Sequence, residues 1–204
     1  MSEIRIAVLV GSLRRESHNQ RLARALERLA PPHVHFHRVE IGDLPPYNQD
    51  EEKRPAPPVQ RFKREIAEAH GVLFVTPEYN RSVPGVLKNA IDHGSRPYGE
   101  SVWAGKPAAV IGVSIGAIGT AVAQQHLRSM LAYLDMPALA QPEVFLHYKD
   151  GLFTHDGQIG DASREFLQGW MDRFVEWVSL HARDTHAPAA LSRRDMDAPR
   201  ARPS

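Results

Sequence analysis

The segment GSLRRESHN, residues 11–19, is the first part of the sequence whose residue types could do chemistry. It follows an apolar run and precedes leucines at helical spacing, so we expect it to join a strand to a helix N-terminus. Free N–H groups and the helix dipole favour an anion at such a place. The side chains that would assist are Ser12, Ser17, Asn19 and the cationic Arg14. The segment lacks both the Walker A and the GxGxxG pattern, so a monophosphate fits it better than a triphosphate. The alternative is a polar connection with a good helix cap.

The segment TPEYNRSVPG, residues 76–85, follows a second apolar run. Two prolines restrict its backbone, and it offers an aromatic ring together with backbone donors and acceptors. This combination suits the polar edge of a flat heterocycle. The alternative is a rigid turn in which Glu78 is simply solvated.

A third segment, GVSIGAIG at residues 112–119, is rich in glycine, which lets a ligand approach the backbone closely. It also matches the G-x-S-x-G nucleophile pattern of serine hydrolases. That hypothesis would need an acid and a histidine, for which Asp135 with His147 or His155 are candidates. No HGGG-type oxyanion element precedes the pattern, and the chain is short for that fold. We therefore keep the hydrolase as a minor alternative.

The chain contains no cysteine, which excludes thiolate catalysis and cysteine-held metal or iron–sulfur centres. Redox chemistry would then depend on a bound cofactor. His33, His35 and His37 share one face of an expected strand and could bind a metal. A solvent-facing strand at the edge of a sheet explains them better.

The elements that must position these segments alternate between strand and helix. Strands are expected at residues 4–10, 33–37, 71–75, 108–113 and 144–153, and helices begin near residues 17, 59, 84, 118 and 161. This order predicts an α/β fold, a doubly wound parallel sheet of five strands with helices on both faces. One domain would span residues 1–180, followed by a disordered or loosely attached tail, residues 181–204.

The composition narrows the possible partners. The formal net charge of +1 gives no electrostatic footprint for nucleic acid. No apolar run is long enough to span a bilayer, and no signal peptide is evident. We therefore expect a cytoplasmic protein that binds neither nucleic acid nor membrane.

Taken together, three stretches resemble the NADPH-dependent FMN reductases, a group that includes bacterial chromate and quinone reductases and azoreductase relatives. They are Gly11–Arg14 with Ser17 and Asn19, Thr76–Asn80, and Val83–Asp92. The resemblance covers about Ile4 to Leu180. Their joint occurrence in this order is specific, although each piece alone is modest.

The resemblance implies a flavodoxin-like fold, bound FMN, and NADPH or NADH as electron donor. Acceptors would be small molecules such as quinones, free flavin, chromate or azo compounds, and the assembly a homodimer or homotetramer. The FMN phosphate would be held by Ser12, Arg14, Ser17, His18 and Asn19. The isoalloxazine would be lined by Pro77, Glu78, Tyr79 and Asn80, with Ser114 and Gly116 on its other side.

No side chain is expected to act as a catalytic acid or base. The turn from Gly116 to Gly119 is expected to stabilise negative charge on the reduced flavin through its backbone N–H groups. Two helices, at residues 118–134 and 84–93, are expected to form a two-fold interface. The Pro-rich segment from Leu44 to Pro58 would shape substrate entry or be a plain connection. The alternative within this fold is a flavodoxin-type electron carrier without an NAD(P)H site.

Overall fold

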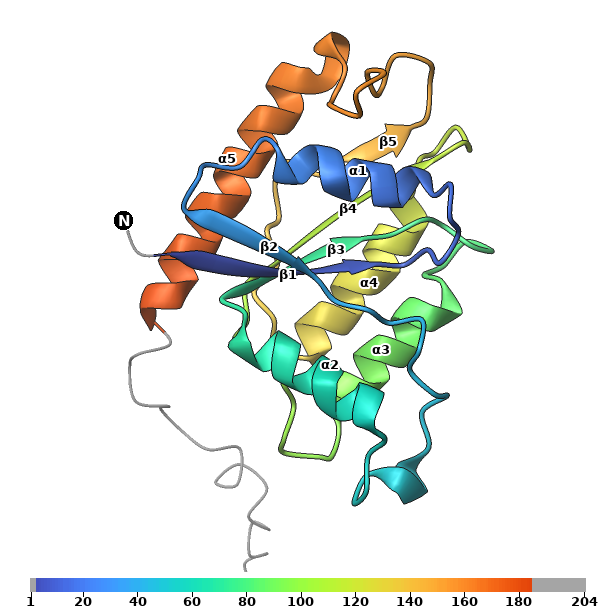
Figure 1. The fold of residues 1–204 in the computed structure, drawn as a ribbon, viewed down its shortest axis with the longest axis vertical. Helices are drawn as coiled ribbons and strands as arrows, with labels where there is room; N and C mark the ends of the chain where they lie inside the picture. The colour runs from blue at the N-terminus through green and yellow to red at the C-terminus, as the bar shows by residue number, and fades with distance from the viewer. Residues whose placement is uncertain (1–2, 185–204) are drawn as a thin grey trace, which may run out of the picture.

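The computed structural model describes residues 3–184 and shows a sheet of five parallel strands (Figure 1). The strands lie in the order β2-β1-β3-β4-β5, which confirms the predicted fold class. Their bounds are Ile4–Val10 for β1, Val34–Arg38 for β2, Gly71–Val75 for β3, Ala108–Ser114 for β4 and Phe145–His147 for β5.

Helices cover both faces of the sheet (Figure 1). On one face lie α1 (His18–Glu27) and α5 (Asp161–Asp184), and on the other α2 (Pro57–Glu68), α3 (Gly85–Ser95) and α4 (Ala121–Tyr133). Each face has its own buried apolar cluster. The central strand β3 is buried throughout because both of its faces are covered, which explains its uninterrupted apolar sequence.

Three segments differ from the sequence-based expectation. The helix expected from residue 118 begins at Ala121. The expected strand at 144–153 is reduced to the three residues of β5, because the chain then folds into a turn at Gly151 (φ 86°). The predicted domain boundary at residue 180 falls inside α5, which continues to Asp184. The remainder of the predicted tail lies outside the described residues.

The histidines of β2 lie at the edge of the sheet, as expected. His35 contacts Glu3 at 3.9 Å and His37 contacts Glu65 at 3.4 Å. Within residues 3–184, no cluster of three or more His, Asp or Glu side chains is arranged to hold a metal ion. No helix in this part of the chain combines the length and apolar character needed to cross a membrane.

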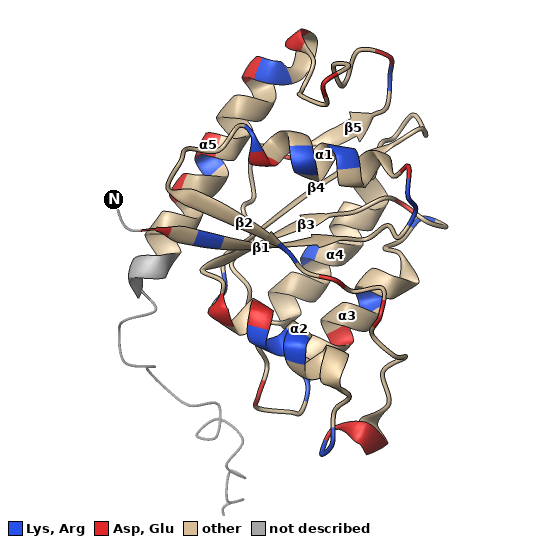
Figure 2. Cartoon of the chain, viewed as in Figure 1, with Lys and Arg blue, Asp and Glu red and all other residues tan. Residues whose placement is uncertain are grey.

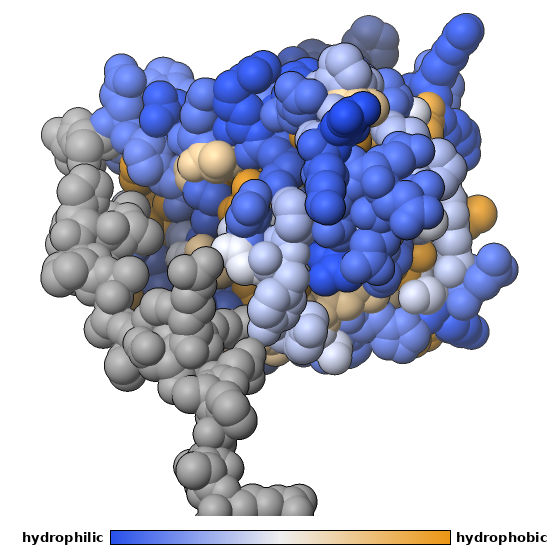
Figure 3. All heavy atoms as spheres, turned by 90° about the horizontal axis from the view of Figure 1, so that it is seen from below, coloured by the Kyte–Doolittle hydropathy of each residue, from blue (hydrophilic) through white to orange (hydrophobic). Residues whose placement is uncertain are grey.

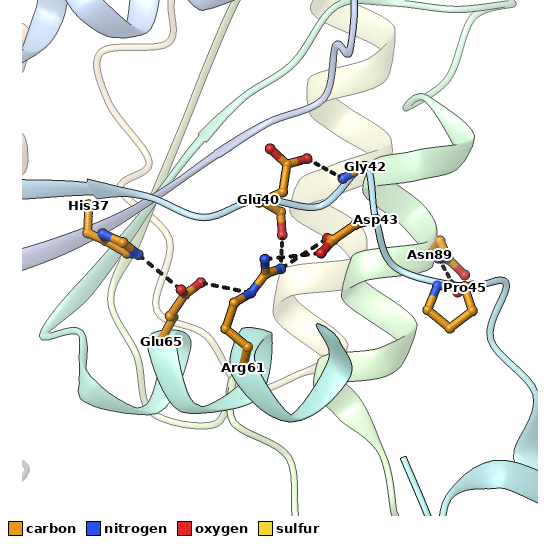
Figure 4. A network of polar contacts seen from close by, with 8 residues as sticks. All are labelled: His37, Glu40, Gly42, Asp43, Pro45, Arg61, Glu65 and Asn89. Carbon is orange, nitrogen blue, oxygen red and sulfur yellow. Dashed lines mark hydrogen bonds and ion pairs between the residues drawn. The ribbon is translucent and has the colours of Figure 1, made fainter. Parts of the chain in front are cut away.

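The Pro-rich segment after β2 forms hydrogen bonds with α3 and contains a short 3₁₀ helix, Gln49–Glu51. The Asn89 side chain of α3 donates to the Pro45 carbonyl and accepts from the Tyr47 N–H, both at 2.8 Å. Arg61 of α2 pairs with Asp43 at 3.1 Å (Figure 4). The segment is therefore held in an ordered conformation against α3.

Candidate functional site

The three polar segments singled out in the sequence meet where β1, β3 and β4 end (Figure 1). The carboxyl ends of parallel strands share one edge, where ligands bind in doubly wound sheets. The first two segments pack directly together. The Gly11 N–H donates to the Val75 carbonyl at 2.9 Å, and a Cβ at Gly11 would lie 3.3 Å from atoms of Pro77, Pro84 and Leu87. A larger residue at Gly11 would push the two segments apart.

The first segment presents several hydrogen-bond donors, both hydroxyls and backbone N–H groups. Ser12 and Ser17 are buried, and the Ser17 Oγ caps α1 by accepting from the Gln20 N–H at 3.2 Å. The N–H groups of His18 and Asn19, in the first turn of α1, donate to no other atom in the part of the chain that is described. Such free N–H groups and hydroxyls at a helix N-terminus favour a phosphate.

The Asn19 side chain has a different role from the one expected. Its amide donates to the Val113 carbonyl at 2.9 Å and accepts from the Val113 N–H at 3.0 Å. It therefore ties α1 to β4 and leaves mainly the backbone N–H of Asn19 for a ligand. Sequence reasoning missed this contact because the two residues are 94 positions apart.

His18 faces Tyr148, which follows β5, with their rings stacked at 3.9 Å. Burial, and then the charges of Arg14 and Arg21, lower the pKa of His18 below its usual 6.5. The ring is therefore neutral at pH 7, and its buried Nδ1 has no hydrogen-bond partner among the described residues. An unpaired buried nitrogen beside free N–H groups fits a site that is completed by a phosphate.

The Glu78 carboxylate likewise has a role that the sequence did not reveal. Its Oε2 accepts from the N–H groups of Val122 at 3.0 Å and Ala123 at 3.1 Å, while the formal cap residue Thr120 makes no side-chain cap bond. Glu78 therefore caps α4, where its charge also complements the helix dipole. Only its backbone is left to line a heterocycle.

The tip of the second segment is a tight two-residue turn. Tyr79 and Ser82 exchange two backbone hydrogen bonds of 3.0 Å each. Between them, Asn80 (φ 51°) and Arg81 (φ 63°) adopt the left-handed conformation, which is unfavourable for residues other than glycine. The turn holds the half-exposed Tyr79 ring at the edge of the site.

The third segment does not form a hydrolase site. The Ser114 Oγ accepts from the Gly116 N–H at 3.1 Å, and the His147 Nδ1 lies 2.9 Å from the Gly116 carbonyl rather than against Ser114. Asp135 follows the far end of α4, about 20 Å from its first turn. The nucleophile of a G-x-S-x-G pattern sits on a sharp, strained turn. Ser114 shows no such strain, since it is not among the described residues that adopt the left-handed conformation. The proposed triad is therefore not assembled.

Packing explains the glycines of this segment instead. A Cβ at Gly112 would lie 2.0 Å from the Thr76 carbonyl oxygen, so that position admits no side chain. Gly119 has a φ of 61°. Between the two, the N–H groups of Ala117 and Ile118 donate to no atom of residues 3–184 and lie on the surface. These two N–H groups are available to a ligand, whereas those of Gly116 and Gly119 donate within the segment, to the Ser114 Oγ at 3.1 Å and the Gly116 carbonyl at 3.0 Å.

Two groups of residues near the site were missed by sequence reasoning. The contact of Tyr148 with the site was missed because residues 144–153 were interpreted as one strand. An aromatic residue directly after a strand end was the available signal. The second group, Arg15, Arg24 and Arg38, lines a hollow beside the first segment. Arg15 stands in the first segment, Arg24 on α1 and Arg38 at the end of β2, and the fold brings the three together.

The Glu78 cap generates a stability prediction. Glu78→Ala should lower the free energy of unfolding by about 2 kcal/mol, because two N–H groups lose a charged acceptor. Glu78→Gln keeps an oxygen acceptor and should lose about 0.5–1 kcal/mol. Urea denaturation measures both, with Glu100→Ala, an exposed glutamate, as the control. An alanine variant as stable as the wild type would show that the cap does not contribute.

Comparison with known proteins agrees with this geometry. The family described as NADPH-dependent FMN reductase matches residues 4–151. A quinone reductase of Pseudomonas putida is 54% identical over 177 residues, which cover 86% of this chain and 95% of that protein. A 2-hydroxy-1,4-benzoquinone reductase of Burkholderia sp. is 52% identical over 176 residues, covering 86% and 96%.

A solved structure extends the similarity to three dimensions. The flavoenzyme FerB of Paracoccus denitrificans, an NAD(P)H:(acceptor) oxidoreductase, superposes with a TM-score of 0.84 at 44% identity and covers 87% of this chain and 98% of its own. Sequence, fold and the arrangement of the three segments therefore agree, and this chain belongs to the NADPH-dependent FMN reductase family.

Proposed function

We propose that this protein passes electrons from NADPH or NADH through bound FMN to quinones, with free flavin, chromate and azo compounds as further acceptors. As a member of its family, the chain is an NAD(P)H-dependent oxidoreductase that uses FMN. The observation that supports the cofactor site most directly is the first segment, which combines the free N–H groups of His18 and Asn19 with the unpartnered Nδ1 of the His18 ring. The names of the two quinone reductases support the acceptor class.

The first segment would hold the FMN phosphate. The groups that we assign are the hydroxyls of Ser12 and Ser17, the Arg14 guanidinium, the His18 ring and the backbone N–H of Asn19. The hydroxyls and N–H groups donate to phosphate oxygens, and Arg14 adds a charge-assisted bond. The phosphate would also raise the pKa of His18 by favouring the charged ring.

The second and third segments would hold the isoalloxazine. We assign Pro77, Tyr79, Asn80 and the backbone of Glu78 to one side of the ring, and Ser114 and Gly116 to the other. The N–H groups of Ala117 and Ile118 would stabilise negative charge near the ring. Bound FMN supplies the redox chemistry, and the protein binds, orients and shields it. We assign no side chain as a catalytic acid or base.

The function is tested by the absorbance of the purified protein. We expect the visible bands of oxidised flavin, their bleaching when NADPH is added without oxygen, and their return when a benzoquinone is added. A flavodoxin-type carrier would keep its bands in NADPH. A protein that takes up no FMN would contradict the proposal altogether.

The phosphate assignment is tested by comparing two ligands. Arg14→Ala should weaken FMN about tenfold or more, because a charge-assisted hydrogen bond to phosphate is lost. Riboflavin, which lacks the phosphate, should bind the variant and the wild type equally. Fluorescence titration of the flavin-free protein measures both affinities. Equal weakening of the two ligands would place Arg14 elsewhere in the site.

We also propose that the protein works in the cytoplasm as a homodimer or homotetramer in which α3 and α4 pair across a two-fold axis. Two large side chains next to this helix are exposed: Ile118, which lies in the turn before α4, is 44% exposed, and Tyr133, the last residue of α4, is 81% exposed. Such pairing would bring a second subunit to the flavin. The view from below, by contrast, shows a mainly hydrophilic surface (Figure 3).

The assembly is tested with one exposed tyrosine on α4. Tyr133→Asp should shift the protein to monomers and lower reductase activity, because a charge would be buried in the interface. Tyr98→Asp, at a tyrosine outside both helices that is 74% exposed, is the matched control. Sedimentation and activity are measured across a dilution series. A fully active wild-type monomer would contradict the proposal.

A further inference from the structure

A hollow of about 620 Å³ lies beside the first segment, on the side of α1 that faces β2. Its walls are that segment, α1 and residues 38–43 after β2. Val8 and Val10 of β1 line it, and Leu13 packs so closely on Gly42 that a Cβ there would lie 2.9 Å from the leucine methyl. Tyr148 approaches α1 from the other side, after β5, so this hollow is separate from the His18 ring contact.

Four arginines line the hollow: Arg14, Arg15, Arg24 and Arg38. Figure 2 shows basic residues along α1 and in the loop before it. Arg38 is neutralised by two hydrogen bonds of 2.8 and 2.7 Å to Glu27. The other three arginines form no ion pair or hydrogen bond with any described residue.

The acidic groups of the opposite wall do not neutralise these three cations. Asp43 pairs with Arg61 at 3.1 Å, and the Glu40 carboxylate accepts from the Gly42 N–H at 2.7 Å (Figure 4). Three guanidinium groups without partners therefore line one hollow, and two of them, those of Arg15 and Arg24, remain once Arg14 is assigned to the FMN phosphate. Guanidinium forks match the oxygens of a phosphate monoester, which they bind with paired charge-assisted hydrogen bonds.

We propose that this hollow binds the 2′-phosphate end of NADPH and so makes NADPH the preferred electron donor. The inference rests on the proposed function, because the nicotinamide must lie against the flavin ring. NADPH is a dinucleotide, so its adenosine end lies well away from the nicotinamide, and we place that end in the hollow next to the segment that would hold the FMN phosphate. The hollow adjoins that same segment, and the exposed side chain of Leu13 offers an apolar contact for an adenine ring.

NADPH and NADH differ only in this phosphate. The preference for NADPH over NADH therefore measures how much the hollow contributes to binding the donor. In the double variant Arg15→Gln/Arg24→Gln, kcat/KM for NADPH should fall about tenfold or more, because two charge-assisted contacts are lost. The value for NADH should stay within about twofold. Arg64→Gln is the control: it removes the same charge from an exposed arginine on α2, outside the hollow.

Calorimetry with the FMN-loaded protein gives a readout that does not depend on turnover. Adenosine 2′,5′-bisphosphate should bind the wild type about tenfold more tightly than 5′-AMP, and the double variant should lose this difference. Inorganic phosphate is the third probe. If it binds as tightly as the bisphosphate, the hollow is a general anion site and the proposal is wrong.

The outcomes separate this inference from the proposed function. A wild-type protein that reduces its flavin equally well with both donors, and that binds the two adenosine phosphates alike, overturns the inference but leaves the function intact. Equal losses with NADPH and NADH in the double variant also overturn it, because they would reflect a general defect. A protein whose flavin neither donor bleaches contradicts the proposed function, while the calorimetry still tests the hollow.

Discussion

The site depends on one buried hydrogen-bonded pair, the Asn19 amide and the backbone of Val113. Strand β4 continues to Ser114, whereas its pairing with β3 stops at Ile111. Alternate residues of a strand direct their N–H and C=O groups to opposite neighbours, and the Ser114 carbonyl already accepts from Tyr148 after β5. The N–H and C=O groups of Val113 therefore point away from β5, into the space past the end of β3. Without partners, these two buried backbone groups would destabilise the fold. The Asn19 side chain supplies the hydrogen-bond donor and acceptor that a neighbouring strand would otherwise provide.

This substitution of a side chain for a strand has a geometric consequence. β3 can end early, which frees residues 76–85 to turn over the sheet, while α1 is fixed to β4 behind them. The Glu78 carboxylate makes the complementary connection from the second segment to α4. The stack of His18 and Tyr148 joins the first segment to the chain after β5. Three segments distant in sequence are thus held by contacts that leave their outward N–H groups free for a ligand.

Sequence reasoning predicted the strands and the three segments because buried parallel strands are continuous apolar runs and their carboxyl ends share one edge. It assigned Glu78 and Asn19 to the cofactor because both lie in the right segments. The structure shows that these side chains serve backbone groups 44 and 94 residues away. No local pattern encodes such partners. Residues 144–153 were wrongly predicted as one strand, since a turn at Gly151 overrides the strand propensity of their second half.

Charge is the property that composition concealed most completely. A formal net charge of +1 gives no electrostatic footprint for nucleic acid. This total does not show which charged side chains are paired with opposite charges and which are not. Where Arg38 meets Glu27 the charges cancel, whereas Arg15 and Arg24 have no acidic partner. Like charges around one hollow destabilise the empty protein, and an anionic ligand removes that repulsion on binding. The first segment therefore carries two kinds of phosphate-binding donor, the neutral N–H groups at the start of α1 and the guanidinium groups of Arg14 and Arg15, in one short stretch of chain.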